Sequence, residues 1–257
     1  MINRTIKRVI ILPLLCVLFS TKLSASQEIK VGGYIFPPFV EQNDKHEIHG
    51  ITLDLIDALN AVQDEYHFKF VLTSSRRRYV AFENGRFDVL FFESMSWGWG
   101  NHPIEASKVF LEGGEVFIAL KSKAKNQSYF KDLNNKSISA MLGYHYGFAN
   151  FNADPEYLNT HFDIHLSSDE GRNIQLVLSG LMDLAIVTQS YLEMFIKNTP
   201  SSESKLLVSE KMDQVYKHTV LVRKDSDFNT KKMNQLIDKL IDSGELERVL
   251  QKYGVKP

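Results

Sequence analysis

The same short pattern occurs once in each half of the chain. The segments ENGRFDVLFF (83–92) and LSGLMDLAIV (178–187) both contain the end of a helical stretch, a glycine, a short turn, an aspartate and an apolar run. A glycine in this place is typical of a helix C-terminus, because it readily adopts the left-handed backbone conformation that ends helices. A continuous apolar run is typical of a strand buried on both faces of a parallel sheet. The repetition therefore predicts two α/β lobes of similar design.

Strands and helices alternate around both copies of this pattern. In the first half the sequence predicts strands at 29–34, 67–74 and 87–92, and helices at 51–62 and 77–84. In the second half it predicts strands at 115–121, 136–142, 182–188 and 217–225, a helix at 171–180 and a helix pair at 233–254. The alternation favours an α/β sandwich in each lobe.

Residues 1–26 have the layout of a secretory signal peptide. Three basic residues precede an apolar run at 9–19, and small polar residues follow it. The run is short for a membrane-spanning helix. We expect cleavage near Ala25 or Ser26 and export to the periplasm, and the alternative is an uncleaved N-terminal anchor.

Cys16, the only cysteine, lies inside this apolar run, so cleavage would leave a mature chain without cysteine. Leu15 precedes it where lipoprotein signals carry a small residue, which argues against lipid attachment. The signal region holds four basic residues and no acidic ones, so the mature chain keeps 26 basic against 31 acidic residues, a net charge of −5. This charge does not favour a nucleic-acid partner.

Several segments together resemble the periplasmic solute-binding proteins of family 3, the polar amino-acid type. They are VGGYIFPPF (31–39), GITLDLIDAL (50–59), ENGRFDVL (83–90), KDLNNKSISAMLGYHYG (131–147) and the C-terminal stretch 222–254. The resemblance implies a two-lobed, type II periplasmic-binding-protein-like fold with a two-strand hinge, and a ligand held between lobes that close around it. It also implies a first lobe at 27–112 and 214–257 and a second lobe at 113–213.

The resemblance argues against an ordinary α-amino acid as the ligand. Amino-acid-binding members carry an arginine after the first-lobe strand for the carboxylate, and an acid after the second-lobe strand for the ammonium group. Here the stretch MSWGWGN (95–101) contains no arginine. Thr188 or Gln189 occupies the place of the acid.

Aromatic residues stand in the loops that the resemblance places at the cleft. Aromatic faces attract cations and stack on flat rings, although each ring could instead pack inside a lobe. Arg77 is expected to begin a helix and reach the cleft, whereas Arg76 and Arg78 are expected in solvent. The ligand-binding residues that we predict are Phe36, Phe39, Arg77, Glu93, Ser96, Trp97, Trp99, Gly143, Tyr144, Tyr146 and Thr188. They favour a small polar, aromatic or cationic solute.

Metal binding is not favoured by the histidine pattern. HEIH (His46, His49) and HFDIH (His161, His165) have spacings that a metal could use, but neither has a third ligand nearby. We interpret these four histidines as surface residues. No metal and no cofactor are expected.

The sequence favours a receptor over an enzyme. The mature chain would have no cysteine nucleophile, and it contains neither Gly-x-Ser-x-Gly nor a phosphate-binding glycine loop. We expect a monomeric, non-catalytic protein that delivers its ligand to an ABC permease or a membrane sensor. The alternative is a dehydratase-like or lyase-like enzyme with Glu93 and His145 as acid and base.

Overall fold

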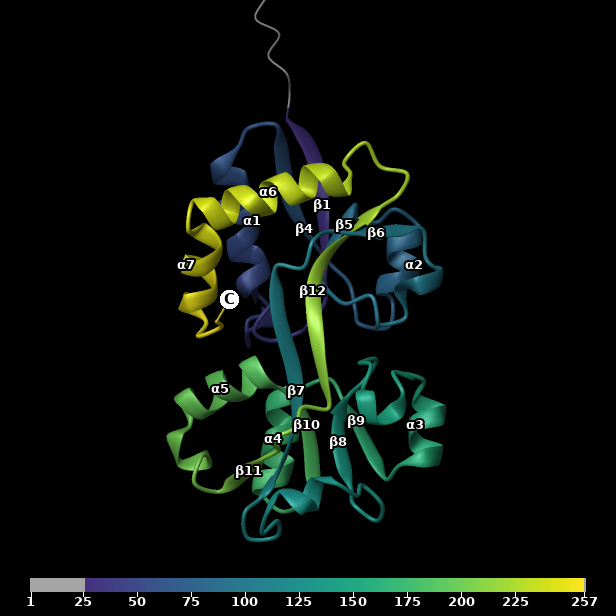
Figure 1. The fold of residues 1–257 in the computed structure, drawn as a ribbon, viewed down its shortest axis with the longest axis vertical. Coiled ribbons are helices and arrows are strands. Elements are labelled where there is room, and N and C mark those ends of the chain that lie inside the picture. The colour runs from purple at the N-terminus through teal and green to yellow at the C-terminus, as the bar shows by residue number, and fades with distance from the viewer. Residues whose placement is uncertain (1–25, 257) are drawn as a thin grey trace, which may run out of the picture.

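The computed structural model describes residues 26–256, which form two lobes joined by two long strands (Figure 1). Residues 1–25 of the predicted signal peptide (1–26), Cys16 among them, lie outside the described residues. Within residues 26–256, every helix is too short or too polar to span a lipid bilayer.

One continuous series of paired strands passes through both lobes, in the order β4-β1-β5-β12-β7-β10-β8-β9. The first lobe contains β1 (Gln27–Gly33), β4 (Tyr66–Leu72), β5 (Val89–Glu93) and β6 (Ile104–Ala106). The second lobe contains β8 (Ile138–Met141), β9 (Ile164–Ser167), β10 (Leu184–Thr188) and β11 (Leu206–Val208). The joining strands are β7 (Leu111–Leu120) and β12 (Gln214–Arg223), and a separate hairpin pairs β2 (Glu41–Gln42) with β3 (Ile48–His49).

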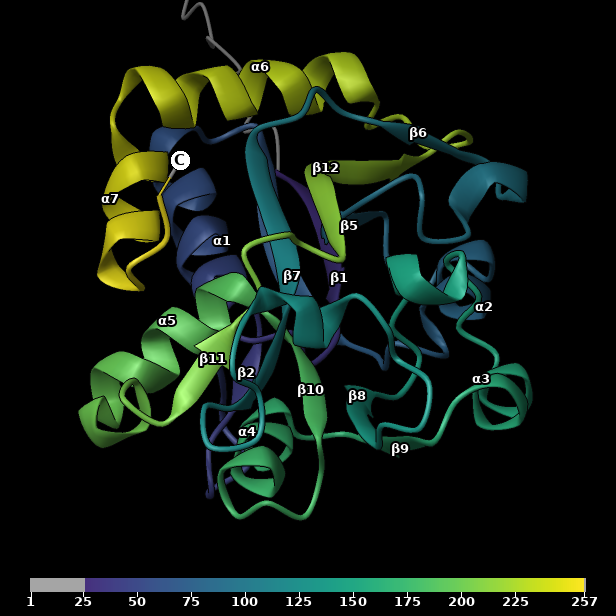
Figure 2. The same ribbon diagram turned by 60° about the horizontal axis from the view of Figure 1, so that its bottom comes forward.

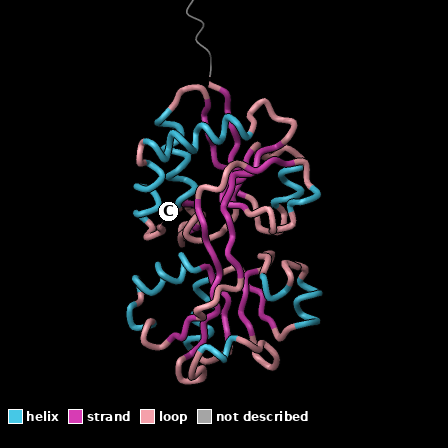
Figure 3. The backbone as a smooth tube through the Cα atoms, in the orientation of Figure 1, coloured by secondary structure: helices cyan, strands magenta, loops and turns pink. Residues whose placement is uncertain are grey.

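Parallel pairing places the strand ends of both lobes at the space between them. β1 pairs in parallel with β4 and β5, and β8 pairs in parallel with β9 and β10. Figure 3 shows β7 and β12 running side by side from one lobe into the other. Because ligands of open α/β sheets bind at the carboxyl ends of parallel strands, the loops after β1, β5, β8 and β10 form the candidate site.

The helices cover the outer parts of each lobe (Figure 2). In the first lobe they are α1 (Ile51–Val62), α2 (Arg78–Glu83), α6 (Thr230–Asp242) and α7 (Glu245–Lys252). In the second they are α3 (Pro155–His161), α4 (Glu170–Leu178) and α5 (Gln189–Asn198). α1 packs against β4, α6 and α7, whereas α4 and α5 pack against β7 and β10.

The repeated pattern has the conformation that the sequence predicts. Gly85 and Gly180 follow α2 and α4 with φ angles of 67° and 76°, in the left-handed region that favours glycine. The apolar runs after them form β5 and β10, in which all residues are buried. α1 also matches its predicted range, and its apolar stripe of Ile51, Leu55 and Leu59 is buried.

Candidate functional site

The two lobes touch each other directly through hydrogen bonds. The Ser75 hydroxyl donates to the Leu142 carbonyl oxygen at 2.9 Å, and the Tyr144 hydroxyl donates to the Ile35 carbonyl oxygen at 3.1 Å. The Tyr79 hydroxyl lies 2.7 Å from His145 Nε2. In each contact one partner belongs to the first lobe and the other to the second, so the structure shows the lobes closed.

Side chains of the protein fill the centre of this interface. The space that remains, the central cavity, has a volume of about 10 Å³. That volume is close to the minimum for a single water molecule. Its lining residues are Tyr34, Phe36, Arg78, Trp97, Glu115, Tyr144 and His145.

Phe36 lies in the middle of the aromatic group. Its ring centroid is 5.9 Å from that of Trp97, 5.6 Å from that of Tyr144 and 6.4 Å from that of Tyr216. All three contacts are edge-to-face, an arrangement that aromatic rings prefer. Rings from the first lobe, the second lobe and the joining strand β12 therefore meet at one point.

A buried ion pair lies beside these rings. Arg78 Nε is 3.2 Å from Glu93 Oε1, and the side chains of the two residues are only 1% and 0% exposed. The other carboxylate oxygen of Glu93 accepts a hydrogen bond from Trp99 Nε1 at 2.7 Å. Burial raises the pKa of Glu93, and the nearby charge of Arg78 opposes this rise.

The backbone turns sharply where β5 ends. Phe92 has a φ angle of 58°, an uncommon value for a residue with a side chain. The pairing of β5 with β12 shifts register at the same place, between Thr219 and Leu221. The regular pleat is thus interrupted directly before Glu93.

Gln214 on β12 connects the joining strands with both lobes. Its Oε1 accepts a hydrogen bond from Trp97 Nε1 at 3.1 Å. Its Nε2 donates to Glu115 Oε2 at 2.5 Å and to the backbone oxygen of His145. Burial raises the pKa of Glu115 well above its ordinary value.

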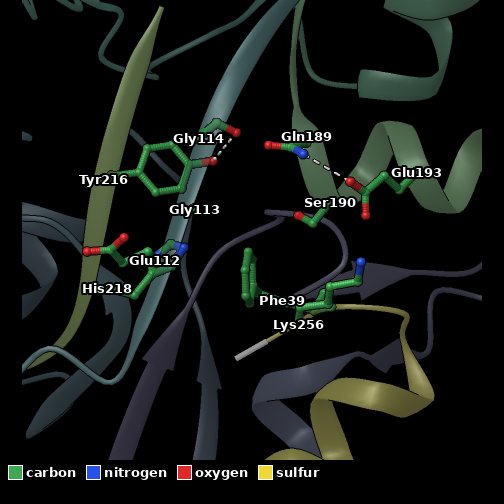
Figure 4. A pocket seen from close by; sticks show the side chains of 11 residues that line it. Phe39, Glu112, Gly113, Gly114, Gln189, Ser190, Glu193, Tyr216, His218 and Lys256 are labelled. Atoms are coloured by element: carbon green, nitrogen blue, oxygen red, sulfur yellow. Dashed lines mark hydrogen bonds between the residues drawn. The ribbon is translucent and has the colours of Figure 1, made fainter. Parts of the chain in front are cut away.

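A larger cavity, the flanking cavity, lies beside the joining strands between α5 and the C-terminal residues (Figure 4). Its volume is about 200 Å³. It is lined by Phe39, Val255 and Lys256 of the first lobe, Gln189, Ser190 and Glu193 of the second, and Glu112, Gly113, Gly114, Tyr216 and His218 of the joining strands. A further cavity of about 360 Å³ lies near Tyr79, His102 and Asp154.

Several predicted site residues do meet at the interface. Phe36, Trp97 and Tyr144 line the central cavity, and Phe39 lines the flanking cavity. The backbone oxygen of Gly143 lies 3.4 Å from a terminal guanidinium nitrogen of Arg78.

Two other predicted residues are buried in the second lobe and line neither of these two cavities. The Tyr146 hydroxyl accepts a hydrogen bond from the Met141 N–H at 2.7 Å, and the N–H of buried Thr188 donates to Glu170.

The prediction that Arg77 reaches the cleft while Arg78 lies in solvent is wrong. Arg77 is exposed, whereas Arg78 is the only lysine or arginine buried within residues 26–256. Arg77 is the N-cap residue of α2. The buried guanidinium is that of Arg78, which lies over the rings of Tyr34 and Tyr79 and beside Glu93.

Two residues of the tryptophan loop are also placed differently from the prediction. Trp99 is fully buried inside the first lobe, with its ring centroid 4.5 Å from that of Tyr79 and 5.8 Å from that of Phe82. The left-handed Gly98 reverses the chain between the two tryptophans and sends Trp99 away from Trp97. Ser96 is exposed, and its hydroxyl contacts that of Ser94 at 2.9 Å.

Some interface residues were missed in the sequence. Gln214, Tyr216 and His218 alternate along β12 and are buried, whereas Val215 and Lys217 between them are exposed. The alternation is visible in QVYKH, but the predicted strand begins only at residue 217. The others that were missed are Tyr34, Glu115 and Glu170.

The histidine pairs considered for metal binding have no added ligand in the structure. Within residues 26–256, no three His, Cys, Asp or Glu side chains are grouped closely enough to hold a metal ion.

Two similar α/β lobes, two joining strands and a ring-lined interface define a two-lobed binding protein of the type II periplasmic class. The chain belongs to the bacterial extracellular solute-binding proteins, family 3, whose family model matches residues 29–256. No curated protein shows significant sequence similarity to the chain.

Solved structures with the same fold include proteins of several kinds. A substrate-binding protein of an ABC uptake transporter from Streptococcus pneumoniae, with bound histidine, has a TM-score of 0.72 at 17% identity, covering 88% of this chain and 92% of that one. A histidine kinase sensor domain has a TM-score of 0.70 at 17% identity, covering 91% and 99%. An ancestral amino-acid-binding protein, a precursor of cyclohexadienyl dehydratase, has a TM-score of 0.66 at 18% identity, covering 88% and 94%. At these identities the likeness establishes the fold.

Proposed function

We propose that this protein is a non-catalytic receptor that captures a small polar, aromatic or cationic solute between its two lobes. The observation that carries the proposal is the meeting of rings from both lobes and from β12 around Phe36. A solute that reaches this point would contact both lobes at once, so its binding would favour the closed arrangement.

The charges at the interface disfavour a carboxylate on the solute. Arg78 is the buried cation that a carboxylate would need, and Glu93 already neutralises it. A bound carboxylate would have to replace Glu93, which would leave that acid buried without its partner. This agrees with the absence of an arginine from the stretch 95–101.

Solute entry requires the lobes to separate. The central cavity of about 10 Å³ holds no organic molecule, so the rings around Phe36 must move apart before a solute can replace their contacts. The flanking cavity has a volume of about 200 Å³. A cavity of about 150 Å³ is already large enough to bind benzene. A single ring with a short substituent therefore suits the site in size.

The partner is proposed from the family. We propose export to the periplasm after removal of residues 1–26, and delivery of the solute to an ABC permease or a membrane sensor by a monomeric receptor. No described side-chain cluster favours catalysis: Glu93 is held by Arg78 and Trp99, and burial lowers the pKa of His145 to about 4.

Identification of the solute tests the proposal. Mass spectrometry of purified protein should reveal a co-purified small molecule. Alternatively, a thermal-shift screen of amines and heterocycles should identify a compound that raises the melting temperature of the protein. Trp97→Ala should weaken binding at least tenfold, since a buried aromatic contact and the hydrogen bond to Gln214 are lost. Arg77→Ala, on the surface, is the matched control and should bind normally.

Two results would contradict the proposal. One is an unchanged dissociation constant for folded Trp97→Ala, which would remove the interface as the binding site. The other is chemical conversion of the identified solute during incubation with the protein, which would support the enzyme alternative.

A further inference from the structure

Glu170 is a buried acid with an incomplete set of hydrogen bonds. It is 2% exposed, and one carboxylate oxygen accepts a hydrogen bond from the backbone N–H of Thr188. Its other oxygen, Oε2, and the adjacent Thr188 hydroxyl make no hydrogen bond of good geometry, although the Thr188 side chain lies close enough to lower the pKa of Glu170. Buried polar groups without partners are rare in folded proteins, so two of them side by side call for an explanation.

Helix capping does not explain Glu170. It is the first residue of α4, but the preceding Asp169 already caps that helix by accepting a hydrogen bond from the Arg172 N–H at 3.0 Å. A carboxylate next to the helix N-terminus gains a modest electrostatic stabilisation. Burial of Glu170 outweighs this gain, since it raises the pKa of the side chain from 4.5 to about 8. The free protein therefore keeps an acid that destabilises it at neutral pH.

Glu170 lies where the second lobe faces the first. Thr188 ends β10 and α4 follows β9, so both residues stand at the strand ends that meet the other lobe. Its charge is close enough to raise the pKa values of Tyr144 and Tyr216, which belong to the interface. Glu41 of the first lobe is near enough to raise the pKa of Glu170 in turn.

The ionisable groups around Glu170 are acids and phenols, apart from His49 beside Glu41. The charges that act on it most strongly are those of Asp169 and Glu41. The other ionisable groups coupled to it or to these neighbours are Glu115, His49, Tyr144, Tyr146, Tyr191 and Tyr216. Arg78, the buried cation of the interface, is paired with Glu93 instead. The groups that act on the pKa of Glu170 itself therefore include no positive charge.

We infer that Glu170 anchors a protonated amine of the bound solute, an inference that rests on the proposed function of the cleft. An ammonium group has three hydrogen-bond donors, and both Glu170 Oε2 and the neighbouring Thr188 hydroxyl oxygen can accept from it. Because Arg78, the one arginine buried in the described interface, is paired with Glu93, the solute class is a small amine without a carboxylate beside it.

Benzylamine is a suitable probe, because it joins one ring to one ammonium group. Titration calorimetry should detect its binding, and Glu170→Gln should weaken that binding at least tenfold through loss of a charged hydrogen bond. Glu156→Gln removes an exposed carboxylate from the first turn of α3, which lines neither the central nor the flanking cavity, and should leave the affinity within about twofold of the wild type, because exposed charges act weakly. Benzyl alcohol and L-phenylalanine should both bind more weakly than benzylamine.

Stability separates an anchoring role from a structural one. Glutamine can still accept the Thr188 hydrogen bond but cannot ionise. Glu170→Gln should therefore melt at nearly the wild-type temperature at pH 4.5, and at an increasingly higher temperature than the wild type as the pH rises towards 8. A structural acid would give the opposite result, a lower melting temperature in the variant.

Proton release gives an independent readout. Glu170 is largely protonated in the free protein at pH 7, so binding of an ammonium ion should release close to one proton. Calorimetry in two buffers of different ionisation enthalpy measures this number, which should fall at pH 9 and in Glu170→Gln.

The outcomes distinguish this inference from the proposed function. Absence of benzylamine binding to the wild type at about 10 mM, or equal affinity in Glu170→Gln, overturns the amine anchor. If a solute found by screening still binds to Glu170→Gln but not to Trp97→Ala, the receptor function stands and only the anchor fails. If neither substitution affects that solute, both proposals fail.

Discussion

Replacing Arg78 by methionine should destabilise the protein strongly, because it leaves a buried carboxylate without its cation. Arg78 and Glu93 are 1% and 0% exposed, so solvent cannot replace the lost partner. Only the Trp99 N–H and the Tyr34 hydroxyl remain to stabilise the Glu93 charge. Removing one member of a buried ion pair costs about 3–5 kcal/mol of unfolding free energy, and we expect this magnitude at pH 8.

The loss should depend on pH in a defined direction. Burial already raises the pKa of Glu93, and removal of the arginine raises it further. Glu93 can then take up a proton as the pH falls, which removes the unpaired charge. The difference between the wild type and Arg78→Met should therefore be smaller at pH 5 than at pH 8.

Urea unfolding followed by circular dichroism measures the effect, with Arg77→Met as the matched control. Arg77 is exposed, so its replacement should change the unfolding free energy by no more than about 0.5 kcal/mol. A double variant, Arg78→Met with Glu93→Leu, should recover much of the loss, since replacement of both partners by apolar residues is often tolerated. If Arg78→Met lies within about 1 kcal/mol of Arg77→Met at pH 8, the reasoning about the buried pair is refuted.

Three further changes test separate contacts. Trp99→Phe removes the hydrogen bond to Glu93 and should cost about 1–3 kcal/mol of unfolding free energy without changing solute affinity; weakened binding would place Trp99 in the cleft after all. Burial lowers the pKa values of His145 to about 4 and of His218 to about 3. Each histidine therefore reduces the unfolding free energy by about 1.4 kcal/mol per pH unit as the pH falls below about 6.5. His145→Gln should flatten the profile of stability against pH between pH 6.5 and 4.5, and parallel profiles of variant and wild type would contradict this. Tyr79→Phe removes the contact with His145 and should increase the radius of gyration of the free protein in small-angle X-ray scattering, whereas an unchanged radius would show that other contacts suffice to hold the lobes closed.

The lobe architecture could be predicted because it depends on local signals. Gly85 and Gly180 mark helix ends through their backbone conformation. The apolar runs after them are buried because they contain almost no polar residues that could face solvent. The joining strands were harder to delimit. β7 begins at Leu111, whereas the predicted strand begins at residue 115. The first residues of β7 were not predicted because Gly113 and Gly114 have low strand propensity.

The site could be predicted only in part because its details depend on tertiary contacts. The sequence indicates an aromatic loop at 94–103, but the left-handed Gly98 decides which tryptophan faces the cleft. The three consecutive arginines at 76–78 do not show which one is buried, because this depends on the contacts of Arg78 with Tyr34, Tyr79 and Glu93. Glu170 gives no local signal, because its importance comes from the partner that it lacks.

The same two strands that connect the lobes also form one wall of the space between them. Gly113 on β7 lies against Tyr216 on β12, so closely that a Cβ atom at Gly113 would be 2.5 Å from the tyrosine ring. In the proposed function the two halves turn about these strands, so a molecule pressing on this ring would act on the axis of that movement. Solute binding in the cleft and bending of the two strands would then be coupled. A permease or sensor that contacts only the outer faces of the lobes could distinguish the solute-bound from the empty protein by the relative orientation of these faces.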